Sequence, residues 1–355
     1  MQTQLEITGD RMRVLGLCLF SLALLTTSIA AYPQQGALAG AKKAEAPADS
    51  KAAPPPPVKK ENWTSLGDLK TGLTPVAPAV LQSDEQAGGF VRELVVLQWR
   101  PKDTIDVWIS RPKGKQKTPV ILYLYSYTDS TDRFHDDAWC KRATADGFAA
   151  VGFVPALTDQ RYKDRPMKEW FVSELPESLG STVHDVQLIL NYLAQRDDMD
   201  MDHVGMFGQG AGATIAILAA QADPRIKTLD VLDPWGDWPD WLKSSRVVPD
   251  SERPKYVSQE FLKSVAPLDP VAYLPALKTP NFRFQQMATD VFTPKSAKER
   301  IAAAVPEQAQ VVKYASPEDL LKAWKISGLS GWIKQQLRPQ KAKEVAGVPT
   351  GIAPN

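Results

Sequence analysis

The sequence predicts an α/β protein with a mostly parallel central sheet and helices on both faces. Short apolar segments alternate with helical segments from Phe90 to Leu337, as a sheet built from strand and helix units requires. A glycine-rich turn also joins an apolar strand to an alanine-rich helix within residues 203–220. With 355 residues, 43% of them hydrophobic, the chain is long enough for one large domain with appendages.

The predicted strands are short apolar segments bounded by turn residues. In chain order they span residues 91–99, 105–110, 119–125, 148–154, 204–207, 226–232, 281–287 and 310–314. The predicted helices span residues 137–146, 183–196, 214–222, 295–304 and, in at least two pieces, 317–337. Gly147 ends the first helix, and Ser181 or Thr182 caps the second, with Asp185 completing a capping box. Residues 158–180 are predicted as a loop with a short helix, and the proline-interrupted residues 238–277 as a small cap.

The turn before helix 214–222 reads Gly208-Gln209-Gly210-Ala211-Gly212. It has the shape of a nucleophile elbow, in which the pattern G-x-S-x-G places a serine on a sharp strand-to-helix turn. The elbow residue holds a strained backbone conformation that costs a residue with a Cβ about 1 to 3 kcal/mol, and glycine removes that cost. Gly210 therefore stands at the nucleophile position, without the reacting oxygen. The spacing fits neither a phosphate loop nor a dinucleotide fingerprint.

By this turn and the order of elements, residues 90–337 resemble the α/β-hydrolase family, particularly exported bacterial esterases, acetylhydrolases and dienelactone-hydrolase-like proteins. The resemblance implies the α/β-hydrolase fold and a triad in the chain order nucleophile, acid, histidine. The nucleophile position then falls at Gly210, and the acid position at Asp290 after strand 281–287. The histidine is expected after strand 310–314, but no histidine follows His203 in the sequence.

Two of the three triad positions are thus vacant. Loss of the serine or the histidine lowers turnover by about 10⁶, while the oxyanion hole and binding alone retain about 10³ to 10⁴ over water. The backbone of Ala211 and of the turn at Ser126 and Tyr127 is expected to form the oxyanion hole, although the family usually has His-Gly at that turn. We therefore predict a catalytically impaired ligand-binding or accessory protein. The alternative is a hydrolase of esters or related bonds that uses a non-standard catalytic constellation.

Two histidines are weaker catalytic candidates, because the elements around them open on the functional edge of the sheet. His135 and His184 are expected to approach the elbow and to form an acid/base or metal site with neighbouring aspartates. The alternative is that these stretches only cap helices. The other members of this hypothesis are Asp136, Asp137 and Asp185, with Ser126 or Ser181 as the nucleophile. No cofactor or metal is predicted, because the acidic residues 198–202 lack the glycine and glutamate of a calcium loop.

An aromatic strip follows strand 226–232. Trp235, Trp238 and Trp241 lie three residues apart, and together with Asp233 they are candidate contacts for an aromatic or sugar ligand. The alternative is that the rings seal the cap onto the core. Asp233 is also a candidate substitute for the triad acid.

The N-terminal residues 1–31 are predicted to be a secretory signal peptide, because Arg11 and Arg13 precede an uncharged apolar stretch. An uncleaved membrane anchor is the alternative. Residues 32–62 are rich in alanine, proline and lysine, and this composition predicts a disordered tether. Residues 63–337 are predicted to form the hydrolase-like domain, and residues 338–355 a flexible tail. After cleavage Cys140 would be the only cysteine, which excludes an intramolecular disulfide.

These features predict a secreted or periplasmic protein that meets a membrane only through an uncleaved N-terminus. A third hypothesis is an interaction module that the tether holds near the membrane. The net charge of +1 gives no support for nucleic-acid binding. The sequence does not identify the small-molecule ligand or substrate.

Overall fold

The computed structural model describes residues 77–100, 103–114, 116–126, 131–156, 175–327 and 330–338, together with residues 75 and 161. These residues belong to the second of two units of the chain, residues 61–355. The predicted signal peptide, the predicted tether and residues 339–355 of the predicted tail lie outside the described residues. Within the described part of the chain, no helix has the length and apolar character needed to cross a membrane.

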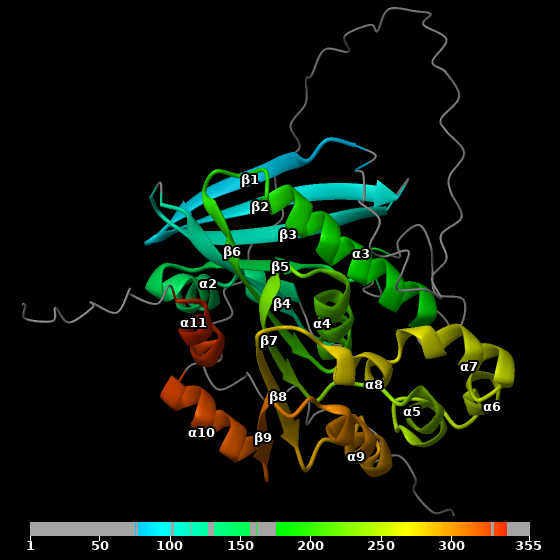
Figure 1. The fold of residues 1–355 in the computed structure, drawn as a ribbon. Helices are drawn as coiled ribbons and strands as arrows, with labels where there is room; N and C mark the ends of the chain where they lie inside the picture. The colour runs from blue at the N-terminus through cyan, green and yellow to red at the C-terminus, as the bar shows by residue number, and fades with distance from the viewer. Residues whose placement is uncertain are drawn as a thin grey trace, which may run out of the picture. The chain divides into compact units, whose positions relative to one another are not determined.

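A nine-stranded sheet forms the centre of this unit, with the strand order β1-β2-β3-β5-β4-β6-β7-β8-β9 (Figure 1). The three pairings that join β1, β2, β3 and β5 are antiparallel, and the five that join β5, β4 and β6 to β9 are parallel. The mostly parallel sheet is thus confirmed. The strands are β1 (Val80–Ala87), β2 (Phe90–Arg100), β3 (Asp103–Pro112), β4 (Thr118–Leu124), β5 (Ala149–Phe153), β6 (Met199–Gln209), β7 (Ile226–Leu232), β8 (Asn281–Met287) and β9 (Gln310–Tyr314).

Strand β1 is absent from the strands that the sequence predicts. Its sequence, VLQSDEQA, is largely polar, because it pairs with β2 on one side only and forms an edge of the sheet. Edge strands carry polar and charged residues more often than central strands do. The apolar pattern on which strand prediction depends is therefore weak at this position.

Helices cover both faces of the sheet, as predicted (Figure 1). The α-helices are α2 (Asp137–Thr144), α3 (Leu175–Leu193), α4 (Ala211–Ala222), α5 (Trp238–Ser244), α6 (Arg253–Tyr256), α7 (Gln259–Val265), α8 (Pro270–Tyr273), α9 (Lys295–Ala304), α10 (Pro317–Ser327) and α11 (Gly331–Leu337). Short 3-10 helices are η2 (Thr131–His135), η3 (Ala145–Gly147), η6 (Ala266–Leu268) and η7 (Leu274–Ala276).

Central strand β4 shows how the two faces divide the core. Its residues Val120, Leu122 and Leu124 join the larger cluster, which includes buried side chains of α3 and α4. The alternate residues Ile121 and Tyr123 join a second cluster with α2 and α11. Successive side chains of a strand point to opposite faces, so a strand buried on both faces becomes a continuous apolar run.

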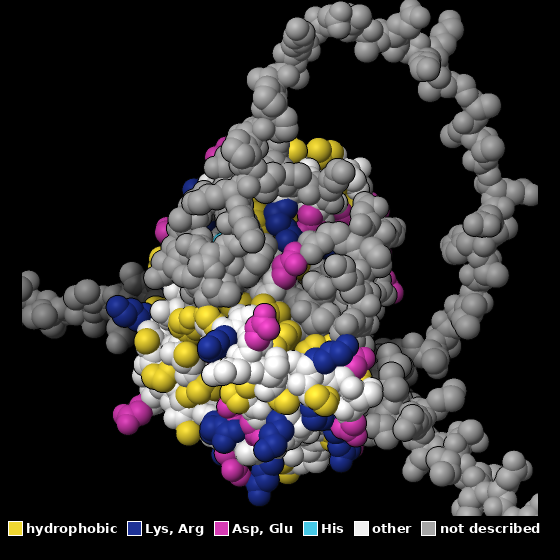
Figure 2. All heavy atoms as spheres, turned by 90° about the vertical axis from the view of Figure 1, so that its right-hand side faces the viewer, with side chains coloured by type: hydrophobic (Ala, Val, Ile, Leu, Met, Phe, Trp, Pro, Cys, Tyr) yellow, Lys and Arg dark blue, Asp and Glu magenta, His cyan; other side chains and the backbone are white. Residues whose placement is uncertain are grey.

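The proline-interrupted residues after β7 form short helices rather than irregular chain. Helices α5 to α8, η6 and η7 follow one another between β7 and β8. A proline stands in the first turn of α5, α6 and α8, where it lacks only an N–H that has no partner inside the helix. On the side of the molecule where α5, α6 and α7 lie, Figure 2 shows basic and acidic side chains interspersed rather than gathered by sign.

The predicted start of the helix after the loop at residues 158–180 is wrong. Helix α3 begins at Leu175, so Ser181 and Thr182 lie inside the helix and are buried instead of capping it. Tertiary contacts satisfy these polar groups, because Thr182 Oγ1 accepts the Ala156 N–H at 3.2 Å. Asp185 forms no capping box either: its carboxylate accepts from Trp99 Nε1 at 2.7 Å and pairs with Arg161.

Buried polar side chains connect the last three strands. The Asp230 carboxylate on β7 accepts from Arg283 Nε at 2.9 Å and from Gln285 Nε2 at 2.7 Å, both on β8. Tyr314 on β9 donates its hydroxyl to Gln285 Oε1 at 2.7 Å. Burial raises the pKa of Asp230, although hydrogen bonds and the charge of Arg283 oppose the shift.

We predict that Arg283→Met lowers the free energy of unfolding by about 3 to 5 kcal/mol, because it leaves a buried carboxylate without its cation. Lys322→Met is the control, since Lys322 pairs with Asp319 at the surface and its loss costs about 1 kcal/mol or less. Guanidinium denaturation of the two variants measures both changes. Equal losses in the two variants would contradict the prediction.

Candidate functional site at the carboxyl edge of the sheet

The turn from β6 into α4 forms the centre of the site. Gly210 has φ 58° and ψ −123°, so the predicted requirement for a glycine backbone at this position is confirmed. Its N–H donates to Leu232 O of the neighbouring strand β7 at 2.9 Å, and its carbonyl accepts from Ala213 N at 3.0 Å. The carboxyl end of β6 is therefore fixed to β7 on one side and to the first turn of α4 on the other.

Three glycines of this turn differ in what surrounds them. A Cβ on Gly208 would lie 2.5 Å from Gly212 O, and a Cβ on Gly212 would lie 2.3 Å from Leu124 O. Backbone atoms thus exclude any side chain at both flanking positions. A Cβ on Gly210 would instead meet side chains, namely Ser126 Oγ at 2.8 Å and Trp235 Nε1 at 3.5 Å.

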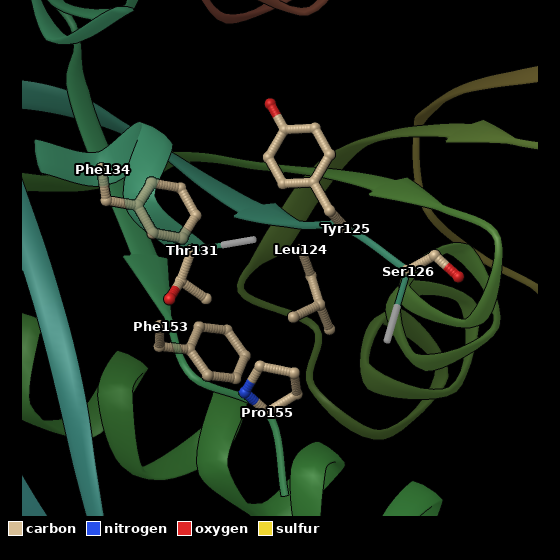
Figure 3. A pocket seen from close by; sticks show the side chains of 7 residues that line it. All are labelled: Leu124, Tyr125, Ser126, Thr131, Phe134, Phe153 and Pro155. Carbon is tan, nitrogen blue, oxygen red and sulfur yellow. The ribbon is translucent and has the colours of Figure 1, made fainter. Parts of the chain in front are cut away.

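Ser126 stands directly after β4, beside the elbow. It borders a small hollow, and in Figure 3 its hydroxyl points away from the other labelled side chains. The other residues around this hollow are Leu124, Tyr125, Thr131, Phe134, Phe153 and Pro155. The Ser126 side chain thus faces the elbow rather than the hollow. Tyr127, the other predicted oxyanion-hole residue of this turn, lies outside the described residues.

Asp233 follows β7 and is the ionisable group next to the elbow along the sheet edge. Its backbone is left-handed, with φ 49°, and its Oδ1 accepts from Met287 N at 2.8 Å. Burial, and secondly the nearby carboxylate of Asp290, raise the pKa of Asp233 to about 8. At neutral pH Asp233 is therefore mostly protonated and able to donate or accept a proton.

Asp290, which the sequence analysis predicts at the triad-acid position, is held by its own loop. Its Oδ1 accepts from Phe292 N at 3.0 Å, and its Oδ2 accepts from Thr293 N at 3.1 Å. Lys298 Nζ lies 3.5 Å from Oδ2 and also donates to the Asp290 carbonyl at 2.6 Å. Lys298 is a site residue that the sequence did not indicate, because a lysine in the amphipathic helix α9 looks like an ordinary solvated side chain.

The structure gives each histidine contacts of its own. The His184 ring on α3 packs on Trp99 of β2, with the ring centroids 4.9 Å apart. The His135 ring on η2 packs on Trp108 of β3, with the ring centroids 3.7 Å apart. His203 pairs with Asp200 in the first half of β6, seven residues or about 23 Å before Gly210.

The expectation that His135 and His184 approach the elbow stays a prediction. The residues grouped with them have structural contacts, since Asp136 caps α2 and Asp137 pairs with Arg92. Ser181 Oγ donates to Ser178 O inside α3 at 3.3 Å. Among the described residues, no three His, Cys, Asp or Glu side chains are grouped so that they could hold a metal ion.

The three tryptophans pack against one another. Trp235, Trp238 and Trp241 are 4%, 1% and 0% exposed, and the centroid of the Trp241 ring lies 4.8 Å from that of Trp235 and 5.6 Å from that of Trp238. This arrangement fits the alternative in which the strip seals the inserted helices onto the core. Only Trp235 turns its indole nitrogen toward Gly210, and its carbonyl accepts from Thr214 Oγ1 of α4 at 2.5 Å.

Comparison with known proteins agrees with this architecture. A family model described as X-Pro dipeptidyl-peptidase (S15 family) matches residues 102–329. No curated protein matches the chain. Several solved structures share the fold, and in the three described next the match covers at least 92% of their own length.

An acetyl xylan esterase from Paenibacillus sp. R4 aligns with a TM-score of 0.58 and 15% identity, over 77% of this chain and 92% of its own. Acetyl xylan esterase 1 from Thermoanaerobacterium sp. JW/SL YS485 aligns with a TM-score of 0.55 and 14% identity, over 75% of this chain and 92% of its own. An S-formylglutathione hydrolase from Agrobacterium tumefaciens aligns with a TM-score of 0.50 and 16% identity, over 72% of this chain and 99% of its own. Identities this low show the fold alone, which is the α/β-hydrolase fold.

We predict that Gly210→Ser lowers the free energy of unfolding by about 1 to 3 kcal/mol, the cost of a Cβ in this strained conformation. Rotation of the Ser126 side chain moves its Oγ away from the new Cβ, while Ser126 Cβ, 3.0 Å from that position, stays in close contact with it. Gly210→Val is expected to cost clearly more, because a β-branched side chain adds a second clash and has few rotamers. Chemical denaturation measures both losses, and equal, negligible losses would show that the turn tolerates any residue.

We predict a pH dependence from Asp233. Its pKa of about 8 in the folded protein exceeds the ordinary value of 3.8, so its contribution to stability is complete below about pH 4 and is lost as the pH rises through 8. The free energy of unfolding therefore falls by up to about 1.4 kcal/mol per pH unit in this range. Asp233→Asn removes this loss, and asparagine tolerates the left-handed backbone.

Denaturation of wild type and Asp233→Asn from pH 5 to pH 9 checks this dependence. As the pH rises, the free energy of unfolding of Asp233→Asn should increase relative to that of the wild type. Asp250→Asn is the control, because the Asp250 side chain is 97% exposed and its replacement leaves the slope unchanged. Parallel curves for Asp233→Asn and wild type would contradict the assignment.

Proposed function

The chain belongs to the X-Pro dipeptidyl-peptidase (S15) family of α/β-hydrolases of the esterase and peptidase type, and from this premise we propose that its elbow site binds an ester or amide ligand without serine-triad turnover. One observation carries the proposal: Gly210, which the sequence resemblance assigns to the nucleophile position, has a φ of 58° in the turn between β6 and α4. The binding edge of the scaffold is present, while the attacking oxygen is not.

The positions of the histidines support the same proposal. A serine nucleophile needs a base within hydrogen-bond reach, about 2.6 to 3.2 Å. His135, His184 and His203 pack against other strands or at the far end of β6. The triad acid at Asp290 has no imidazole to orient, and its oxygens accept from its own loop instead.

A second candidate function is hydrolysis, which the comparisons support because the matched family and the structural neighbours are hydrolases. We propose Asp233 and Asp290 as its non-standard catalytic groups. Asp233 is mostly protonated at neutral pH and stands beside Asp290. In such a pair one carboxylate takes a proton from an attacking water, and the protonated partner gives its proton to the leaving group. This mechanism needs neither a serine at position 210 nor a histidine.

The cellular location is part of the proposal. The basic and then apolar residues 11–31 support export to the periplasm or the medium, with residues 32–62 as a tether. The mature N-terminus tests this point. A start near Tyr32 supports export and cleavage, whereas retention of residues 1–31 in the membrane fraction supports the anchored alternative.

We predict that the purified protein hydrolyses 4-nitrophenyl acetate, acetylated xylan and Gly-Pro 4-nitroanilide no faster than about 10³ to 10⁴ times the uncatalysed rate. We also expect no adduct with a fluorophosphonate by intact mass, because the elbow carries no nucleophile. Turnover at ordinary esterase rates together with a covalent adduct would refute the main proposal, and the modified residue would identify the nucleophile.

The same assays test the carboxyl mechanism. It predicts turnover without an adduct, and the loss of that turnover in Asp233→Asn and in Asp290→Asn. Asp250→Asn should keep the wild-type rate, because its side chain is solvated and lies outside the site. Turnover that survives both site variants would exclude this candidate.

A further inference from the structure

We infer that Lys298 of α9 is the positioning residue of the two carboxyl groups: its ammonium group takes the place of a bound cation in the loop that carries Asp290, and it acts on Asp233 through that loop. The inference rests on the second candidate function, hydrolysis by Asp233 and Asp290, and names the residue that prepares the pair. Its test does not depend on turnover, because the effect of Lys298 on Asp233 is a property of the free protein.

Oxygen atoms of the loop after β8 surround the Lys298 ammonium group. Nζ donates to the carbonyls of Met287 at 3.2 Å and Asp290 at 2.6 Å, and it lies 3.5 Å from the Ala288 carbonyl and from Asp290 Oδ2. Carbonyl and carboxylate oxygens are also the ligands that hard metal cations take. An ammonium group has three N–H donors and no acceptor, so it fits the same surroundings. The Lys298 side chain is 12% exposed, and the loop is therefore folded around its charge.

Met287, the last residue of β8, connects Lys298 to both carboxyl groups. Its carbonyl accepts from Lys298 Nζ and from Asp290 N, the latter at 3.2 Å. Its N–H donates to Asp233 Oδ1 at 2.8 Å. The same residue is thus held by the lysine on one side and by Asp233 on the other. A change at Lys298 therefore reaches Asp233 through a single residue of the loop.

The charge of Lys298 also acts on Asp233 directly. Burial raises the pKa of Asp233 most, and the carboxylate of Asp290 raises it further. The hydrogen bond from Met287 N and the charge of Lys298 oppose these two effects, and the resulting pKa is about 8. Near neutral pH such a group both gives and takes protons. Without the lysine charge, Asp233 would hold its proton to a higher pH.

Three substitutions separate the charge of Lys298 from its hydrogen bonds. Lys298→Arg keeps the charge, Lys298→Gln keeps N–H donors without a charge, and Lys298→Met keeps only an apolar chain of similar length. Lys295→Gln is the matched control, because Lys295 lies on the same helix and its side chain is 92% exposed. Denaturation curves show whether each variant is folded.

The measurement is an NMR titration of the carboxyl carbons in protein with isotopically labelled aspartate, and Asp233→Asn identifies the Asp233 signal. We expect Lys298→Gln and Lys298→Met to raise the titration midpoint of Asp233 by about half a pH unit or more, because a nearby opposite charge is lost. Lys298→Arg should keep the midpoint near about 8, and Lys295→Gln should not change it. A lysine that only held the loop in shape would give the opposite sign, since a loosened loop admits water to Asp233 and lowers its pKa.

The outcomes separate this inference from the functions proposed above. An unchanged or lower midpoint in Lys298→Gln, with the variant folded, overturns the inference and leaves both proposed functions standing; Lys298→Met serves in the same way if Lys298→Gln does not fold. A midpoint raised equally in Lys298→Arg also overturns it, because the charge is then not the cause. A raised midpoint in the neutral variants alone supports the inference, and if such a protein hydrolyses none of the substrates named above, the carboxyl mechanism fails while the action of Lys298 on Asp233 stands.

Discussion

The left-handed backbone of Gly210 is the constraint on which the carboxyl edge of the sheet depends. A strand that passes directly into a helix has to reverse direction within one residue, and φ 58° achieves this at the end of β6. The flanking glycines let α4 approach β4 so closely that no side chain fits at Gly208 or Gly212. Ser126, from the end of β4, lies beside this turn, and Asp233 follows the strand to which Gly210 is hydrogen-bonded.

The same turn is the basis of the proposal that this α/β-hydrolase scaffold works without a serine triad. In a serine hydrolase the elbow residue carries the nucleophile at the cost of backbone strain, and the late histidine supplies the base. Here glycine removes the strain and the nucleophile together. In both functions proposed above, the carboxyl edge acts through other groups, among them the carboxyl groups of Asp233 and Asp290.

Buried polar contacts hold this edge in shape. Asp230 connects β7 to β8, and Gln285 extends the connection to Tyr314 on β9. On the other side, Asp185 attaches α3 to Trp99 of β2. Such groups stabilise a fold only when each partner is present, because an unpaired buried charge costs more than the pair contributes. The loops that carry Asp233 and Asp290 therefore start from strands whose positions are fixed.

The sequence by itself determined the order of strands β2 to β9 and of the helices between them outside the cap, the mostly parallel sheet and the glycine elbow, because apolar periodicity and glycine turns are local signals. The bounds of β7, β8, β9 and α9 follow directly from such signals. Only the tertiary structure decided where His135 and His184 lie, and that α3 extends back to Leu175 through buried serines and threonine. It also brought the Ser126 hydroxyl to Gly210, 84 positions later in the sequence. These contacts join residues on separate strands, and their positions depend on strand order and packing, which no local pattern encodes.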